Sequence, residues 1–137
     1  MNSPEQLLSE HGFYAAAVHG QSMEPLLFDH RDVVYIETAP AYRKRDVVLF
    51  RRANGQLVLH RLIRCDGDTL WACGDNDFVP EKIASSQILG RMTAYTRNGR
   101  TTDIRAFSYR LYSAIWCLSM PTKRFLQRVY QHGRRRR

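Results

Sequence analysis

Short runs of alternating apolar and polar residues fill most of the chain before Asp103. Gly, Asn, Asp or charged residues bound each run, and the runs recur at intervals of about 8–12 residues, which is typical of all-β barrels and folded sheets. The expected strands cover residues 13–18, 32–37, 46–50, 56–63, 70–73, 88–96 and 101–103. We therefore predict a mainly β fold, with an antiparallel sheet that is coiled or closed into a barrel.

A short helix is expected before the first strand. Ser3 suits the N-cap position, Pro4 suits the first helical position, and Gln6 completes a capping box. Gly12 is expected to end this helix, because glycine readily adopts the left-handed conformation of a C-terminal cap.

A helical period replaces the alternation after Asp103. One row of apolar residues recurs at helical spacing beside a face of aromatic residues: Phe107, Leu111, Ile115 and Leu118, next to Tyr109, Tyr112 and Trp116. Pro121 is expected to break this helix, and a second short helix is expected around residues 125–130. The chain thus divides into a β domain with its N-terminal helix, residues 1–103, and a helical tail, residues 104–137.

Charge separates the same two parts. Residues 1–103 hold 12 Lys and Arg against 13 Asp and Glu, whereas residues 104–137 hold 9 Lys and Arg and no acid. A basic tail indicates an anionic membrane surface or a nucleic acid as its partner. No base-reading motif accompanies the arginines, which argues against nucleic acid. We expect the tail to bind an anionic membrane surface, and the pattern says nothing about oligomeric state.

The sequence lacks the patterns of a disulfide framework, a metal site, a secretory signal and a membrane span. The three cysteines form no C-x-x-C pair, so neither a disulfide framework nor a metal site is expected. Glu5 and Glu10 interrupt the start of the chain, which has neither the basic segment nor the long apolar run of a secretory signal. No run approaches the roughly 20 apolar residues of a membrane span. The expected location is the cytoplasm, with peripheral attachment to the inner membrane face.

Three segments of the β domain carry residues suited to catalysis. Ser22 lies in a Ser-Met-Glu-Pro turn, His60 lies in an expected strand, and Asp75 lies in a Gly-Asp-Asn loop. A serine in a tight turn, a histidine on a later strand and an acid on a later loop are the components of a serine nucleophile and its base. Histidine suits the role of base near neutral pH, since its ordinary pKa is about 6.5.

In their order and spacing, these segments resemble the type I signal peptidases, which share a superfamily with the self-cleaving SOS-repressor peptidases. The resemblance is strongest to the endoplasmic-reticulum and archaeal branch, in which a histidine takes the place of the bacterial lysine base. It spans about residues 18–92 and implies the coiled antiparallel β fold of the signal peptidases. It also implies a serine endopeptidase that cleaves a peptide or protein precursor without a metal or cofactor. Ser22 would be the nucleophile and His60 the general base.

A third residue would hold the far nitrogen of the histidine and stabilise the imidazolium. Asp75 is the first candidate, because Gly-Asp-Asn stands at the equivalent place in the signal-peptidase family. Asp77 and Glu81 are close enough in sequence to compete with it. The choice among the three acids stays open.

The turn around Ser22 must also supply hydrogen-bond donors to an oxyanion, and the Ser22 N–H is the natural one. Members of the family often carry a serine two residues before the nucleophile as a second donor, but Gly20 stands there in this chain. Met23 is expected to face apolar substrate or the core. Pro25 is expected to stiffen the turn by fixing its own φ.

Two other functions stay open. A self-cleaving regulator of the same fold is less favoured, because the expected base is not lysine and no DNA-binding helix pair is expected before the β domain. A non-catalytic module that uses the basic tail on a membrane or nucleic acid would need none of the three segments.

Overall fold

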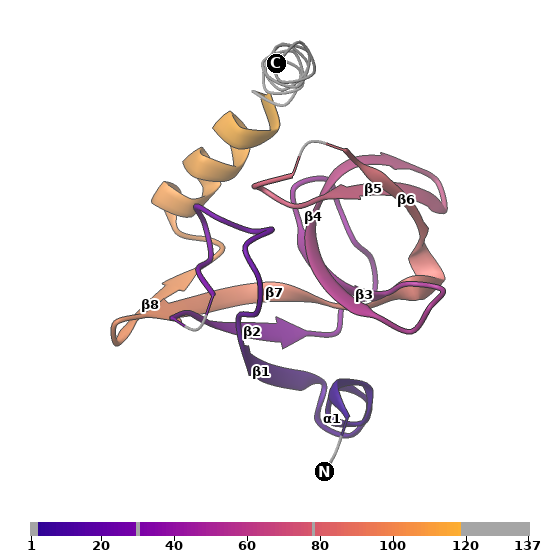
Figure 1. Cartoon of the computed structure of the whole chain (residues 1–137), viewed down its shortest axis with the longest axis horizontal. Helices are drawn as coiled ribbons and strands as arrows, with labels where there is room; N and C mark the ends of the chain where they lie inside the picture. The colour runs from indigo at the N-terminus through magenta and orange to yellow at the C-terminus, as the bar shows by residue number, and fades with distance from the viewer. Residues whose placement is uncertain (1–2, 30, 78, 119–137) are drawn as a thin grey trace, which may run out of the picture.

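The computed structural model describes residues 3–29, 31–77 and 79–118, which form one coiled antiparallel sheet with flanking helices (Figure 1). Its strands are β1 (Phe13–Ala17), β2 (Val33–Glu37), β3 (Val47–Arg51), β4 (Leu57–Asp66), β5 (Thr69–Cys73), β6 (Glu81–Ala84), β7 (Ile88–Arg97) and β8 (Arg100–Asp103). They pair in the order β1-β2-β7-β3-β4-β5-β6, and β8 pairs with β7 beside this path. The mainly β prediction is confirmed. The barrel alternative is wrong for the described residues, because β1 and β6 end the pairing path without joining each other.

Strand β3 explains how one sheet encloses two apolar cores. Val47 and Leu49 belong to one buried cluster, whereas Val48 and Phe50 belong to the other. Successive side chains of a strand point to opposite faces, so β3 is covered on both sides as the sheet coils around it. This double burial explains why β3 is an uninterrupted apolar run rather than an alternating one.

The expected strands are all present, with ends that differ by a few residues. Strand β4 continues beyond the expected limit to Asp66, and β6 was not predicted. In β6 only Ile83 is buried, so its sequence lacks the apolar alternation that marks a strand. A short 3₁₀ helix, η1 (Ser85–Gln87), links β6 to β7.

Helix α1 (Pro4–His11) has the ends that its sequence predicts. The Ser3 hydroxyl accepts a hydrogen bond from the Gln6 N–H at 3.2 Å, and the Gln6 side chain accepts one from the Ser3 N–H at 2.9 Å. Gly12 caps the other end with a φ of 71°. The two hydrogen bonds between Ser3 and Gln6 satisfy N–H groups that the start of a helix would otherwise leave without partners.

Residues 107–118, here called the tail helix, are helical and lie against the sheet (Figure 1). Tyr109 and Ser113 are buried on its inner side, with exposures of 7% and 3%. Pro121 and the second expected helix fall outside the described residues, and the proposed division after residue 103 stays a prediction. Among the described helices, none is long and apolar enough to cross a membrane.

Candidate active site

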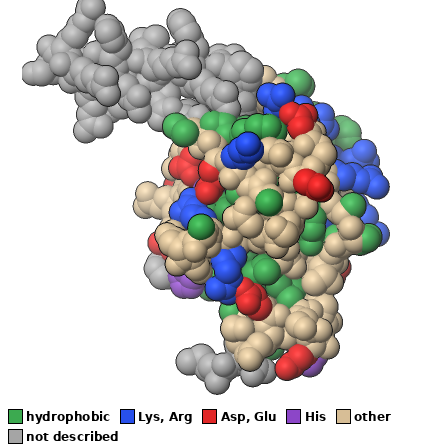
Figure 2. Space-filling view, turned by 90° about the vertical axis from the view of Figure 1, so that its right-hand side faces the viewer, with side chains coloured by type: hydrophobic (Ala, Val, Ile, Leu, Met, Phe, Trp, Pro, Cys, Tyr) green, Lys and Arg blue, Asp and Glu red, His purple; other side chains and the backbone are tan. Residues whose placement is uncertain are grey.

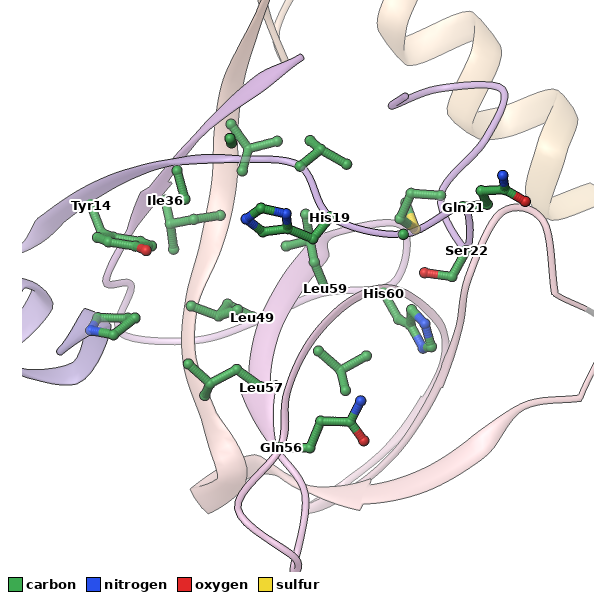
Figure 3. A pocket seen from close by; sticks show the side chains of 18 of the residues that line it. Tyr14, His19, Gln21, Ser22, Ile36, Leu49, Gln56, Leu57, Leu59 and His60 are labelled. Carbon is green, nitrogen blue, oxygen red and sulfur yellow. The ribbon is translucent and has the colours of Figure 1, made fainter. Parts of the chain in front are cut away.

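A cavity of about 480 Å³ opens between β1, the turn that follows it, and strands β2 to β4. Much of its wall is apolar and comes from Tyr14, Ile36, Leu49, Leu57 and Leu59. Ser22 and His60 line the same cavity, and Figure 3 shows both side chains at one end of it. The fold thus brings two of the three predicted segments to one pocket, although 38 positions separate these residues in the sequence.

The loop after β5 holds the backbone of the Ser22 turn in place. The Asn76 N–H donates to the Ser22 carbonyl at 2.8 Å, and the Asn76 side chain donates to the Gln21 carbonyl at 3.1 Å. A Cβ atom on Gly74 would lie 2.4 Å from the Ser22 carbonyl oxygen and 2.6 Å from Oδ2 of Asp77. Glycine is therefore required at position 74, because any side chain would push the two loops apart.

His60 projects from β4, where it pairs with Val48 of β3, and its side chain is almost fully buried. Its Nε2 lies 3.5 Å from Oδ2 of Asp77, and its Nδ1 lies 3.5 Å from Oε1 of Glu81. Nδ1 makes no hydrogen bond with any described residue. Burial lowers the pKa of His60 below 6.5, although the charges of Asp77 and Glu81 oppose this shift. The imidazole is consequently neutral at neutral pH.

Glu81 is held in place by a residue that the sequence did not single out. Nε and Nη2 of Arg52 donate to the two carboxylate oxygens of Glu81 at 3.0 and 2.7 Å. This hydrogen bonding lowers the pKa of Glu81, so the carboxylate stays ionised beside Nδ1 of His60. Arg52 follows a buried strand and has no motif around it, so only the pairing of distant segments reveals its role.

Asp75, the first candidate for the third residue, is occupied by other partners. Both of its carboxylate oxygens accept hydrogen bonds from the buried Arg61 guanidinium, at 2.8 and 2.9 Å. The Tyr112 hydroxyl donates to Oδ2 of Asp75 at 2.9 Å, and the Trp116 indole N–H donates to its backbone carbonyl at 3.0 Å. Among the charged groups that affect the pKa of His60, Asp75 has the smallest effect.

The turn residues around Ser22 have distinct environments. The Ser22 N–H donates no hydrogen bond to a described residue. Gly20 lines the cavity with a φ of 83°, a left-handed conformation that a serine would adopt only with strain. Met23 is buried in the core, where its sulfur accepts the Asp75 N–H at 3.5 Å. Pro25 is exposed and follows a cis peptide bond.

Comparison with known proteins identifies one family. The model of the family described as Peptidase S24-like matches residues 1–93. This segment contains every residue that lines the cavity. A search of curated proteins finds no match to the chain.

Proposed function

The chain belongs to the Peptidase S24-like family, and from this membership we propose that it is a serine endopeptidase with Ser22 as nucleophile and His60 as general base. The observation that carries the proposal is a buried histidine with a lowered pKa that lines the same cavity as Ser22. A serine hydroxyl is a weak nucleophile until a neighbouring base accepts its proton. A neutral imidazole in a pocket with a largely apolar wall is able to accept that proton.

The proposed reaction has two halves. In the first, Oγ of Ser22 attacks the carbonyl carbon of the scissile bond while its proton passes to His60. The tetrahedral intermediate then expels the amine, which takes the proton from His60 and leaves an acyl ester on Ser22. In the second half, His60 deprotonates a water molecule, which attacks the ester carbon. The bond to Oγ of Ser22 then breaks, the acid product leaves, and His60 returns the proton to Oγ. The Ser22 N–H is the proposed donor to the oxyanion in both halves.

We propose Glu81 rather than Asp75 as the residue that orients the imidazole. Glu81 lies beside Nδ1 and is fixed by Arg52, whereas both oxygens of Asp75 are bound to Arg61. Asp77 lies beside Nε2 and lines the cavity. Nε2 is then the nitrogen that faces the substrate. The Asp77 side chain must move away from Nε2 when the Ser22 hydroxyl approaches it.

The proposed substrate is a peptide or protein precursor that binds in an extended conformation. Strand β1 pairs only with β2 in the described sheet, so its other edge offers backbone hydrogen-bonding groups beside the cavity. A substrate strand that pairs with this edge would lay its side chains into the apolar wall. The histidine base is the feature that relates this chain to the Ser-His branch of the signal peptidases within the wider superfamily.

The test uses a mixture of peptides, because the natural substrate is not identified. The purified protein is incubated with a peptide library, and new termini are identified by mass spectrometry. Wild-type protein should generate defined new termini, and Ser22→Ala should generate none while it keeps its thermal stability, since truncating a turn serine costs little. Ser86→Ala, which removes an exposed hydroxyl elsewhere, is the matched control and should cleave normally.

A second readout does not depend on the substrate. A fluorophosphonate probe should label Ser22 in the wild-type protein and in Ser86→Ala, but it should not label Ser22→Ala. Labelling and cleavage that persist in Ser22→Ala would exclude the proposed nucleophile. A wild-type protein that neither cleaves nor reacts would favour the non-catalytic binding module.

A further inference from the structure

The tail helix carries its apolar residues on the outside. Four large apolar side chains form one stripe along it, here called the outer stripe, and are widely exposed: Phe107 79%, Leu111 48%, Ile115 56% and Leu118 75%. In the described ranges, the other exposed large apolar side chains are Phe13 and Val79. A surface helix normally buries its apolar stripe against the core, so this orientation requires an explanation.

Hydrogen bonds to a buried ion pair hold the outer stripe away from the sheet. Arg61 is 0% exposed, and its Nη1 donates to the Ser113 hydroxyl at 2.6 Å. Tyr112 and Trp116 donate to Asp75 from the same side of the helix, at 2.9 and 3.0 Å. Rolling the helix to bury the outer stripe would break these bonds and leave buried polar groups without partners, which is costly. The outer stripe is therefore built to face away from the domain.

The charge of the segment that carries the outer stripe indicates what covers the stripe. Residues 104–137 carry 9 basic residues and no acid, and the exposed Arg110 lies on the tail helix itself. The β domain has no such excess, and acidic and basic side chains are interspersed on the face shown in Figure 2. An apolar stripe within a strongly basic segment of the sequence is the pattern of a helix that lies in the plane of an anionic bilayer.

We propose that the outer stripe of the tail helix is a docking surface for an anionic lipid bilayer. The 12 described residues of the helix are about 18 Å long, enough for the four side chains to enter the interface together. Basic residues near the lipid headgroups add electrostatic attraction. A second copy of the chain is a poorer occupant, because pairing two outer stripes would bring two strongly basic segments together.

Docking would also set the position of the rest of the protein. The inner face of the helix is bonded to Arg61 and Asp75, and these residues adjoin His60 and the loop that holds the Ser22 turn. The cavity would then lie at a fixed place beside the bilayer. The lipid inference itself does not depend on the peptidase proposal, because Ser22→Ala should bind vesicles as well as the wild type.

The test is flotation of the full chain with phosphatidylcholine vesicles that contain or lack phosphatidylglycerol, at low and high salt. Wild-type protein should float with the anionic vesicles at low salt and be released by high salt, since salt screens the attraction. The Phe107→Ser/Ile115→Ser variant should partition at least tenfold more weakly, a change of about 1.4 kcal/mol. Val79→Ser is the matched control, because Val79 is as exposed as Phe107 but lies outside the helix. Thermal unfolding of each variant checks that the fold is retained.

Three results would overturn the inference. Wild-type protein that stays with the aqueous fraction at low salt would exclude an anionic bilayer as the occupant. Equal flotation of wild type and Phe107→Ser/Ile115→Ser would show that charge alone attracts the protein and that the outer stripe is not the contact. A dimer that depends on Phe107 and Ile115, without vesicle binding, would assign the outer stripe to a second copy.

Discussion

Burial and the neighbouring carboxylates shift the pKa of the His60 imidazole in opposite directions. Burial disfavours the protonated imidazolium and has the larger effect on the pKa, whereas the charges of Asp77 and Glu81 favour the imidazolium. The pKa therefore falls below 6.5, and the neutral base is the main form at physiological pH. This balance can be measured through activity, because the proposed mechanism begins with a neutral His60 in the free protein.

We predict that kcat/KM rises with pH through a single ionisation with a midpoint below 6.5 and reaches a plateau near neutrality. The sign follows from the base: protonation at low pH removes the acceptor for the Ser22 proton. His60→Gln should abolish cleavage and with it the rise of kcat/KM at low pH, here called the acid limb. A rise centred well above pH 8 would instead indicate a lysine-like base and would contradict the role of His60.

The two acids beside His60 provide a matched comparison, since each lies 3.5 Å from one ring nitrogen. Neutralising either should lower the pKa of His60 further, because both charges favour the imidazolium. Glu81→Gln should also lower the plateau of kcat by roughly tenfold or more, because an orienting carboxylate stabilises the imidazolium that forms. Asp77→Asn should keep most of the plateau. The reverse result, measured in the same pH series, would make Asp77 the orienting residue.

At the scale of elements, the contact between the Ser22 turn and the loop after β5 determines where Ser22, the proposed nucleophile, lies. Gly74→Ala should reduce kcat/KM strongly, because its Cβ would overlap the Ser22 carbonyl oxygen. Forcing such an atom into a packed site typically costs about 1–3 kcal/mol of unfolding free energy. Kinetics and denaturant unfolding of the same variant measure the two effects.

Gly67→Ala is the control for this prediction. Gly67 has a φ of 60°, and a Cβ there would meet nothing within 4 Å. The variant should therefore lose about 1 kcal/mol of stability through backbone strain alone and keep its activity. If Gly74→Ala were as active as Gly67→Ala, the two loops would not control the position of Ser22.

At the scale of the whole molecule, the buried pair of Arg61 and Asp75 joins strand β4, the loop after β5 and the tail helix. Asp75→Asn should destabilise the protein by about 3–5 kcal/mol, because it leaves the buried guanidinium without its counter-charge. Tyr112→Phe removes one hydrogen bond to Asp75 and should cost about 1 kcal/mol. Urea unfolding measures both.

The same variants separate a structural acid from a catalytic one. Tyr112→Phe, which stays folded, should retain the acid limb and most of the plateau in kcat. Asp75→Asn assayed at low temperature should retain activity in its folded fraction. A fully folded Asp75→Asn protein without activity would restore Asp75 as the third catalytic residue.

Local features of the sequence were sufficient for much of this structure. The capping box at Ser3 and Gln6 and the strands with clear alternation all follow from interactions between near neighbours in the chain. The local structure at Ser22, His60 and Asp75 was also predictable, because their neighbours are typical of a turn, a strand and a loop. Strand β6 was missed because only one of its side chains is buried, so no alternation marks it.

Contacts between distant segments decided the rest. The sequence named Asp75, Asp77 and Glu81 without a choice among them. The structure shows which acids Arg61 and Arg52 bind, and our proposal of Glu81 as the orienting residue rests on these contacts. Likewise, the tail helix showed two large nonpolar or aromatic faces, and nothing local determined which would face the sheet. The buried charge of Arg61 decided it, because only the face with tyrosine, serine and tryptophan could satisfy the ion pair. The outer stripe was therefore left facing away from the sheet.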